Sequence, residues 1–318
     1  MDGKLDDESW KAAPWTDDFV DIEGDLRIKP RFRTRVKMLW DDDYLYIGAE
    51  LEEPHVQGTF TKPDSYIFHE DNDFEVFINP DGNNHNYAEL EMNALNTVWD
   101  LRLKKPYRDG GKAEDDWNIP GLKTAVHVNG TINNPRDIDK GWTIEIAIPW
   151  QITDALNGKP ARPPRDGEQW RINFSRVQWR FDIEDGKYVR RKDRKEDNWV
   201  WSPQEAVDMH RPERWGYVQF STAPPGKATF RPDPAGPAKH MLQQIYHAQR
   251  KFYAKNKRYA ATLPELKLHN LTHDSLLAPP VLKLQGTGYW ATVELRRPDR
   301  GVRKWRIRQD SLTEPVAK

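Results

Sequence analysis

The sequence of 318 residues contains no cysteine. Disulfide bonds, thiolate-bound metals and cysteine nucleophiles are therefore excluded, but the compartment is left open because many exported proteins also lack cysteine. No run of apolar residues approaches the length that a membrane-spanning helix needs. The formal net charge is only −1, so no overall field would attract nucleic acid or an anionic membrane. Neither is expected as a partner.

Charge is divided unevenly along the chain. Residues 239–318 carry 16 Lys and Arg against 6 Asp and Glu, whereas the residues before them carry 33 against 44. Residues 223–238 contain five prolines and two glycines, which is typical of a semi-rigid linker. We therefore expect a first domain at residues 1–222, a Pro-rich linker at 223–238 and a small basic domain at 239–318.

The first domain has the pattern of an antiparallel β-sandwich. Short alternating segments recur with turn residues between them. We expect a mainly β, jelly-roll-like fold with one short helix at 150–156 and long loops at 104–120 and 181–197. The expected strands cover residues 33–39, 44–51, 74–79, 87–93, 98–103, 122–128, 142–149, 170–180 and 215–221.

The basic domain is expected to be α+β. Its helix, at residues 239–255, is predicted by one apolar stripe, which consists of Met241, Leu242, Ile245, Ala248 and Phe252. Two strands are expected at 286–295 and 302–308, joined by a turn at 298–301.

The stretch Asp71–Asn93 holds the most suggestive chemistry. Its second strand should place polar and apolar side chains on opposite faces, because side chains alternate along a strand. The expected polar face consists of Tyr87, Glu89, Glu91 and Asn93, and the apolar face of Ala88, Leu90 and Met92. Carboxylates and an amide beside an aromatic ring suit a sugar, although a solvated strand can carry the same groups.

A sugar site needs a flat ring for the C–H face of the pyranose and planar polar groups for its hydroxyls. Twelve of the 14 tryptophans precede residue 222, and we expect most of them in the core. The rings predicted to bind ligand are Trp99, Trp199 and Trp201, with Trp117 and Trp179 as further candidates. The predicted polar groups are Glu75, Glu89, Glu91 and Asn93, with Arg102 and Arg176.

Some of these residues also allow other interpretations. Trp199 and Trp201 would point the same way in an extended segment, but they could equally pack as a small core. Glu89 and Glu91 would lie ~7 Å apart on one strand face, a spacing that an inverting glycoside hydrolase uses. Carboxylates on one strand are also common without catalysis.

Calcium is a possible cofactor, because hard oxygen donors cluster in three acidic turns. None of the turns has the spacing of an EF-hand loop, and such turns also form for backbone reasons. The candidate ligands are Asp71, Asp73 and Asp81.

A family resemblance is carried by five segments in order over residues 2–221, namely DGKLDDESW, VKMLWDDDYLYIGAE, DNDFEVFINPDG, WTIEIAIPW and RWGYVQF. Together they resemble a family 9 carbohydrate-binding module. The resemblance implies a β-sandwich that binds sugars without hydrolysing them, often with structural calcium, in secreted proteins. It implies a sugar contact for Glu75. It also places His69 and Met209 where the family has clamping tryptophans, and Glu91 where the family has an arginine.

We therefore expect non-catalytic carbohydrate binding by a secreted or periplasmic protein whose targeting segment is not in this chain. The alternatives are a structural or adhesion module with a degenerate sugar site, and a glycoside-active enzyme with a Glu pair. The later segment IYHAQRKFYAKNKRYAATLPEL resembles the part of type IV pilin-like proteins that follows their hydrophobic helix, and implies little about function.

Overall fold

The computed structural model describes residues 1–25, 27–296 and 301–316. The chain divides into two compact units. The first contains Met1–Pro80, Asn86–Leu103 and Ala113–Thr229, and the second contains Asp81–His85, Lys104–Lys112 and Phe230–Lys318. The expected mainly β fold class is confirmed. Among the described helices, none combines the length and apolar character needed to cross a membrane.

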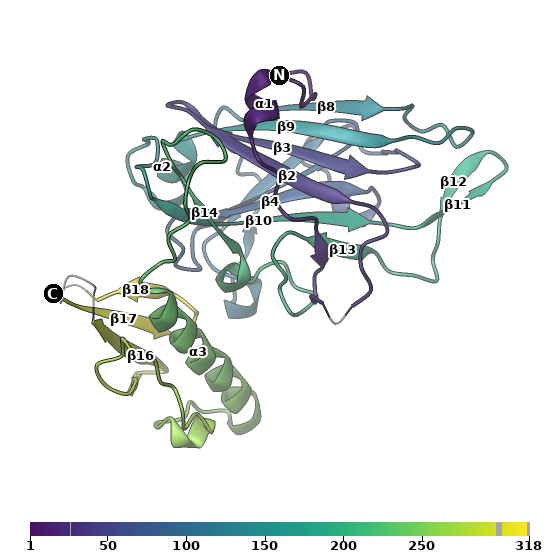
Figure 1. Ribbon diagram of the computed structural model, residues 1–318. Helices are drawn as coiled ribbons and strands as arrows, with labels where there is room; N and C mark the ends of the chain where they lie inside the picture. Colours follow the sequence, from purple (N-terminus) through teal and green to yellow (C-terminus); the bar gives the residue numbers. More distant parts are fainter. Residues whose placement is uncertain (26, 297–300, 317–318) are drawn as a thin grey trace. The chain divides into compact units, whose positions relative to one another are not determined.

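Two antiparallel sheets form the first unit (Figure 1). Over the described residues the larger sheet has eight strands, in the order β1-β13-β10-β4-β5-β6-β7, with β14 also paired to β10. These strands are β1 (Val20–Asp21), β4 (Asp73–Asn79), β5 (Tyr87–Asn93), β6 (Val98–Leu103), β7 (Ala113–Glu114), β10 (Gln169–Gln178), β13 (Asp197–Val200) and β14 (Gly216–Gln219). The smaller sheet has the order β2-β3-β9-β8, made of β2 (Thr34–Trp40), β3 (Tyr44–Glu52), β8 (Lys123–Asn129) and β9 (Gly141–Pro149).

Alternation along the strands builds the core between the sheets. Phe74 and Val76 of β4 point into this core, whereas Asp73 and Glu75 point to the other face of the sheet. The expected apolar face of β5 is confirmed, because Ala88, Leu90 and Met92 are all in the core. Burial of each large apolar side chain contributes roughly 1.5–3 kcal/mol.

Smaller elements complete the first unit. Two short helices, α1 (Glu8–Ala12) and α2 (Gln151–Asn157), flank the sheets. The expected loop at residues 181–197 instead contains a hairpin of β11 (Phe181–Glu184) and β12 (Lys187–Arg190). Its turn is Asp185-Gly186, with both residues at positive φ. That dipeptide is a strong hairpin signal, so this part of the loop prediction was wrong for an identifiable reason.

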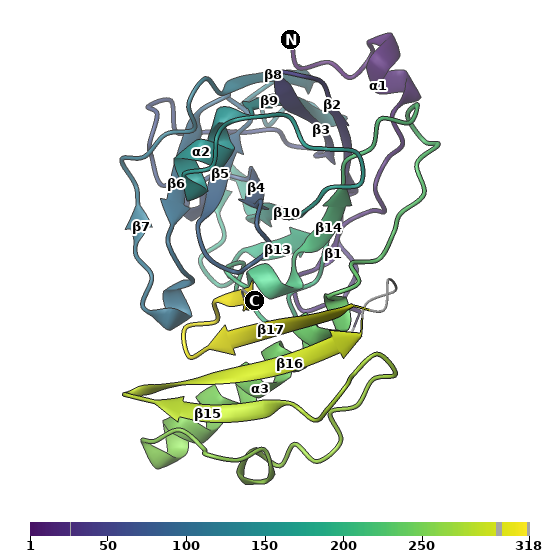
Figure 2. The same cartoon turned by 90° about the vertical axis from the view of Figure 1, so that its left-hand side faces the viewer.

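The second unit packs one helix on one sheet (Figure 2). The expected helix at 239–255 lies within α3 (Gly236–Asn256), which begins inside the expected linker, with Pro237 in its first turn. The strand order is β15-β16-β17-β18, made of β15 (Val281–Gln285), β16 (Gly288–Arg296), β17 (Val302–Arg308) and β18 (Thr313–Pro315). The turn expected at 298–301 lies outside the described residues, except for Gly301.

A buried ion pair joins β10 to the segment that follows β3. Arg176 is 0% exposed, and its Nη2 lies 3.0 Å from Oε2 of Glu53. Its Nε donates to Gln178 and its Nη1 donates to Thr34. Burial lowers the pKa of Arg176 to about 10, although the nearby Glu53 carboxylate opposes this shift.

Replacing Glu53 with alanine should lower the free energy of unfolding by about 3–5 kcal/mol, because Arg176 would remain charged and buried without its partner. Urea unfolding followed by tryptophan fluorescence measures the loss. The matched control, Glu50→Ala, removes a partly exposed carboxylate paired with Arg33 and Arg35, and should cost no more than about 1 kcal/mol. Equal losses in both variants would contradict a special role for the buried pair.

Candidate functional site

The acidic residues of Asp71–Asn93 meet on the outer face of the larger sheet, which is the face turned away from the sandwich core. In the pairing of β4 with β5, Glu75 lies directly opposite Glu91. The neighbouring strands continue this row, with Ser175 of β10 beside Glu75 and Trp99 of β6 beside Glu91. Like charges directly opposite one another repel, so this register brings together groups that disfavour each other.

These acidic side chains are buried. Asp73, Glu75, Glu89 and Glu91 are between 0% and 6% exposed, although they point away from the main core. They lie on the same face as a second apolar cluster, in which Ile67 and Trp215 from outside these strands pack against residues of β4, β5 and β6, namely Phe77, Tyr87, Trp99, Leu101 and Leu103. The face is therefore not the solvated strand surface that the sequence also allowed.

Burial changes the acidity of all four groups. It raises the pKa of Glu75 to about 7. For Asp73, Glu89 and Glu91, burial is the largest cause and the charge of Glu75 the next, and together they hold each pKa well above its usual range. The neutral forms of these carboxyls are therefore favoured wherever no cation balances them.

His210 reaches this face from the loop between β13 and β14. Its Nε2 lies 3.7 Å from Oε2 of Glu89, and its Nδ1 lies 3.0 Å from the hydroxyl oxygen of Tyr87. The ring also meets Phe77 edge-on. No sequence pattern marked His210, because its partners lie more than a hundred residues away in the chain.

Four rings contact one another near Glu91, and we call them the aromatic cluster: Tyr66, Phe68, His69 and Trp99. Tyr66 is 52% exposed and its ring centroid lies 4.4 Å from that of Trp99, which is itself 4% exposed. Phe68 stacks parallel to Trp99, and its backbone N–H points to Oε2 of Glu91 at 3.4 Å. The available sequence signal was the run of aromatic residues just before Glu70 and Asp71.

The structure brings together four residues that were predicted to bind ligand, namely Glu75, Glu89, Glu91 and Trp99. Asn93 follows on β5, but its side chain holds the next turn. Its Oδ1 accepts from the N–H groups of Leu95 and Thr97, and its Nδ2 donates to Phe60 and Asp71. The burial and polarity of Asn93 are thus explained by its role in holding this turn.

The other predicted ligand residues lie elsewhere. Trp199 is 2% exposed in the main core, and Trp201 packs against that core beside Gly216, where a Cβ would lie only 2.3 Å from the indole ring. Arg102 pairs with Glu114 and donates to the carbonyl of Ala155. Together with the buried Arg176, these residues belong to the framework, and the interpretation of the two tryptophans as core is the one that the structure supports.

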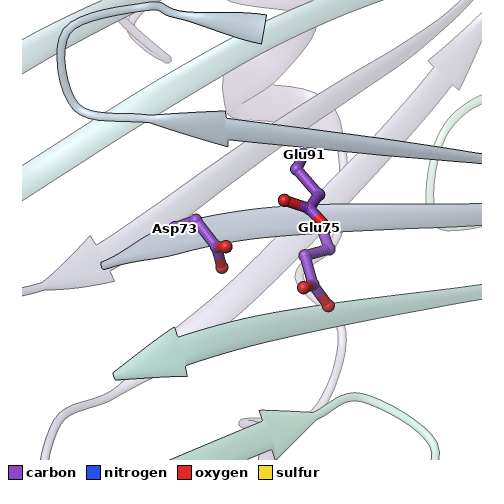
Figure 3. A group of neighbouring side chains, drawn as sticks. All are labelled: Asp73, Glu75 and Glu91. Carbon is purple, nitrogen blue, oxygen red and sulfur yellow. The ribbon is translucent and has the colours of Figure 1, made fainter. Parts of the chain in front are cut away.

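The three candidate metal ligands also separate. Asp73 joins Glu75 and Glu91, with one oxygen from each within 4.8 Å of the others (Figure 3). The carboxylate of Asp71 instead accepts from the N–H groups of Thr59 and Phe60. Asp81 belongs to the other compact unit.

An open pocket of about 340 Å³ lies beside the β11–β12 hairpin. Trp179, Phe181 and Tyr188 contribute rings to its wall, and Gln178 and Asn72 contribute amides. Asn72 accepts from the Trp179 N–H, and the Trp179 indole donates to the carbonyl of Phe68, so the ring is held in place. A larger pocket of about 630 Å³, near Arg33 and Asn129, has no comparable set of rings. Of the rings in the smaller pocket, Trp179 was one of the further candidates for ligand binding predicted from the sequence.

Guanidinium groups give the Trp179 pocket a partly positive wall. Arg31 and Arg180 both pair with Asp197, at 3.2 and 3.4 Å. Burial, and next the charge of Arg180, lower the pKa of Arg31. Two cations that share one carboxylate can still donate to a ligand, and amides and guanidiniums are the donors that sugar hydroxyls accept.

The raised pKa values of the buried acids predict that stability depends on pH when a chelator keeps metal ions away from these carboxyls. Between the ordinary Glu pKa of 4.5 and the folded value of about 7, the folded protein keeps a proton that the unfolded chain has released. The free energy of unfolding should therefore fall as pH rises through this window. Urea unfolding at several pH values measures it, and Glu75→Gln should flatten the slope. A slope that rises over the same window would contradict this account.

Comparisons with known proteins give the family. A family model described as carbohydrate family 9 binding domain-like matches residues 1–221. Exoglucanase XynX of Acetivibrio thermocellus is 25% identical over 158 residues. The match covers 50% of this chain but only 12% of the length of that protein. A family 9 carbohydrate-binding module from Caldicellulosiruptor kristjanssonii is similar in its complexes with cellotriose and with glucose. The first has 14% identity, a TM-score of 0.45 and coverage of 74% of this chain and 94% of that one. The glucose complex has 15% identity and a TM-score of 0.44, and the match covers 70% of this chain and 92% of that one. Because the family model matches more than half of its residues, the chain belongs to the carbohydrate family 9 binding domain-like family.

Proposed function

We propose that the first unit binds carbohydrate without hydrolysing it, in the pocket beside Trp179. The observation that carries this proposal is the ring-lined pocket of about 340 Å³ in a chain of this family. Its volume is in the range of small-ligand sites. A pyranose would place its C–H face on a ring and direct its hydroxyls to the guanidinium groups of Arg31 and Arg180, whose side chains are partly exposed.

Binding without hydrolysis is favoured by the burial of the carboxyl groups. A glycoside hydrolase needs two carboxyls on either side of an accessible glycosidic bond. Glu89 and Glu91, the pair considered from the sequence, are 6% and 1% exposed beneath the aromatic cluster. A sugar chain has no access to them in this arrangement.

Glucose and cellotriose are the first ligands to test, because they occupy the similar modules from Caldicellulosiruptor kristjanssonii. We also propose that the protein acts as a secreted or periplasmic binder, as its family membership suggests. One observation favours the alternative of a structural or adhesion module: His69 and Met209 stand where the resemblance places two clamping tryptophans.

Trp179→Ala should lower the affinity for the best-bound oligosaccharide at least about fivefold, since a stacked ring contributes about 1 kcal/mol beyond its buried area. Isothermal titration with a glycan chosen from an array measures the loss. Tyr66→Ala is the matched control, because it removes an exposed ring from the aromatic cluster and leaves the pocket lining intact.

Equal loss in the two variants would place the sugar elsewhere on the unit. Absence of binding to every glycan on the array would favour the structural module. Release of reducing sugar by the unmodified protein, abolished in Glu91→Gln, would establish the enzyme instead.

A further inference from the structure

Three carboxylates converge at one place beneath the aromatic cluster. Asp73 and Glu75 come from β4 and Glu91 from β5, and the antiparallel register sets Glu75 opposite Glu91. One oxygen from each lies within 4.8 Å of the other two (Figure 3). The sheet fixes these positions, since all three residues lie within paired strands rather than in loops.

Two oxygens in this group lack any hydrogen-bond partner in the described part of the chain. They are Oδ2 of Asp73 and Oε2 of Glu75, and both atoms are buried. The other oxygen of Asp73 accepts from the N–H of Val177 at 3.0 Å, which fixes the orientation of this carboxylate. Buried polar atoms without partners are rare in folded proteins, and each calls for a specific explanation, such as a bound ion.

Side-chain cations do not balance this charge. Within residues 1–25, 27–296 and 301–316, neither Lys nor Arg forms an ion pair with Asp73, Glu75 or Glu91. The His210 imidazole pairs with Glu89, which lies two residues before Glu91 on β5. Buried charges in proteins are normally paired or coordinate a metal.

The donors are all carboxylate oxygens, which select hard cations such as calcium and magnesium over zinc or copper. Oxygens that bind calcium at 2.3–2.6 Å lie at most about 5 Å apart, whereas those around magnesium lie at most about 4 Å apart. Separations of up to 4.8 Å suit the larger ion.

We propose that Asp73, Glu75 and Glu91 bind one calcium ion on the outer face of the larger sheet. The ion removes the repulsion between Glu75 and Glu91 and supplies a partner for the two unpaired oxygens. It ties β4 to β5 under the segment that carries the aromatic cluster. The site is separate from the Trp179 pocket, and the proposal does not depend on sugar binding.

Calorimetric titration tests the site. The full chain is freed of metal with chelator, returned to chelator-free buffer at pH 7.5 and titrated with calcium chloride. Glu75→Gln and Glu91→Gln should each weaken calcium binding at least tenfold, and calcium should raise the Tm of the unmodified protein. Glu70→Gln is the control, because Glu70 is an exposed carboxylate that pairs with Arg190, and it should bind calcium normally.

A second readout separates a metal site from a general structural role. In chelator, Glu91→Gln should unfold at the same temperature as the unmodified protein or higher, because it removes a like-charge pair, whereas in calcium it should unfold lower. Unchanged calcium affinity in both Gln variants would overturn the proposal. So would a complete lack of calcium binding at millimolar concentration, or tighter binding of magnesium or zinc.

Discussion

The outer face of this sandwich depends on the juxtaposition of Glu75 and Glu91 across β4 and β5. Two carboxylates directly opposite one another, and buried, are unstable unless a proton or a cation neutralises them. Segments far away in the sequence close over this pair instead of leaving it in water, as shown by the packing of Ile67 and Trp215. The arrangement concentrates negative charge where the sheet provides no balancing side chain within its described residues.

The burial of the acids sets them apart from the open pocket of the first unit. The acids are enclosed and rigidly placed, which suits a small ion. The open space lies beyond Trp179, where rings, amides and guanidiniums line a pocket of ligand size. Asn72 links the acids to the pocket, because it precedes Asp73 at the start of β4 and its side chain accepts from the Trp179 N–H. An ion bound by Asp73 would therefore steady one wall of the pocket.

Much of the fold could be predicted from local pattern. The expected strand at 87–93 coincides with β5, and the alternation that puts Leu90 inside and Glu91 outside is confirmed. The apolar stripe of the second unit likewise predicted α3. These successes rest on side-chain periodicity, which is a local property. The hairpin at Asp185-Gly186 was missed although its turn signal was present.

The site could be predicted only in part, since its character depends on contacts between distant segments. Alternation correctly placed Glu75, Glu89 and Glu91 on one face, but it could not show that Trp215 and His210 pack on that face. Trp199 shows the opposite kind of error. Its sequence context suggested ligand binding, but contacts with distant segments place it in the core. The resemblance places an arginine at position 91, and the glutamate found there turns a pair of opposite charges into a pair of like charges.

The most direct test of this account is a crystal structure of the protein grown in calcium, with the anomalous signal of the ion measured. We expect an ion 2.3–2.6 Å from an oxygen of each of Asp73, Glu75 and Glu91. Carboxyl groups hydrogen-bonded to one another with no ion between them, or a calcium ion bound elsewhere in the unit and none at this place, would contradict it.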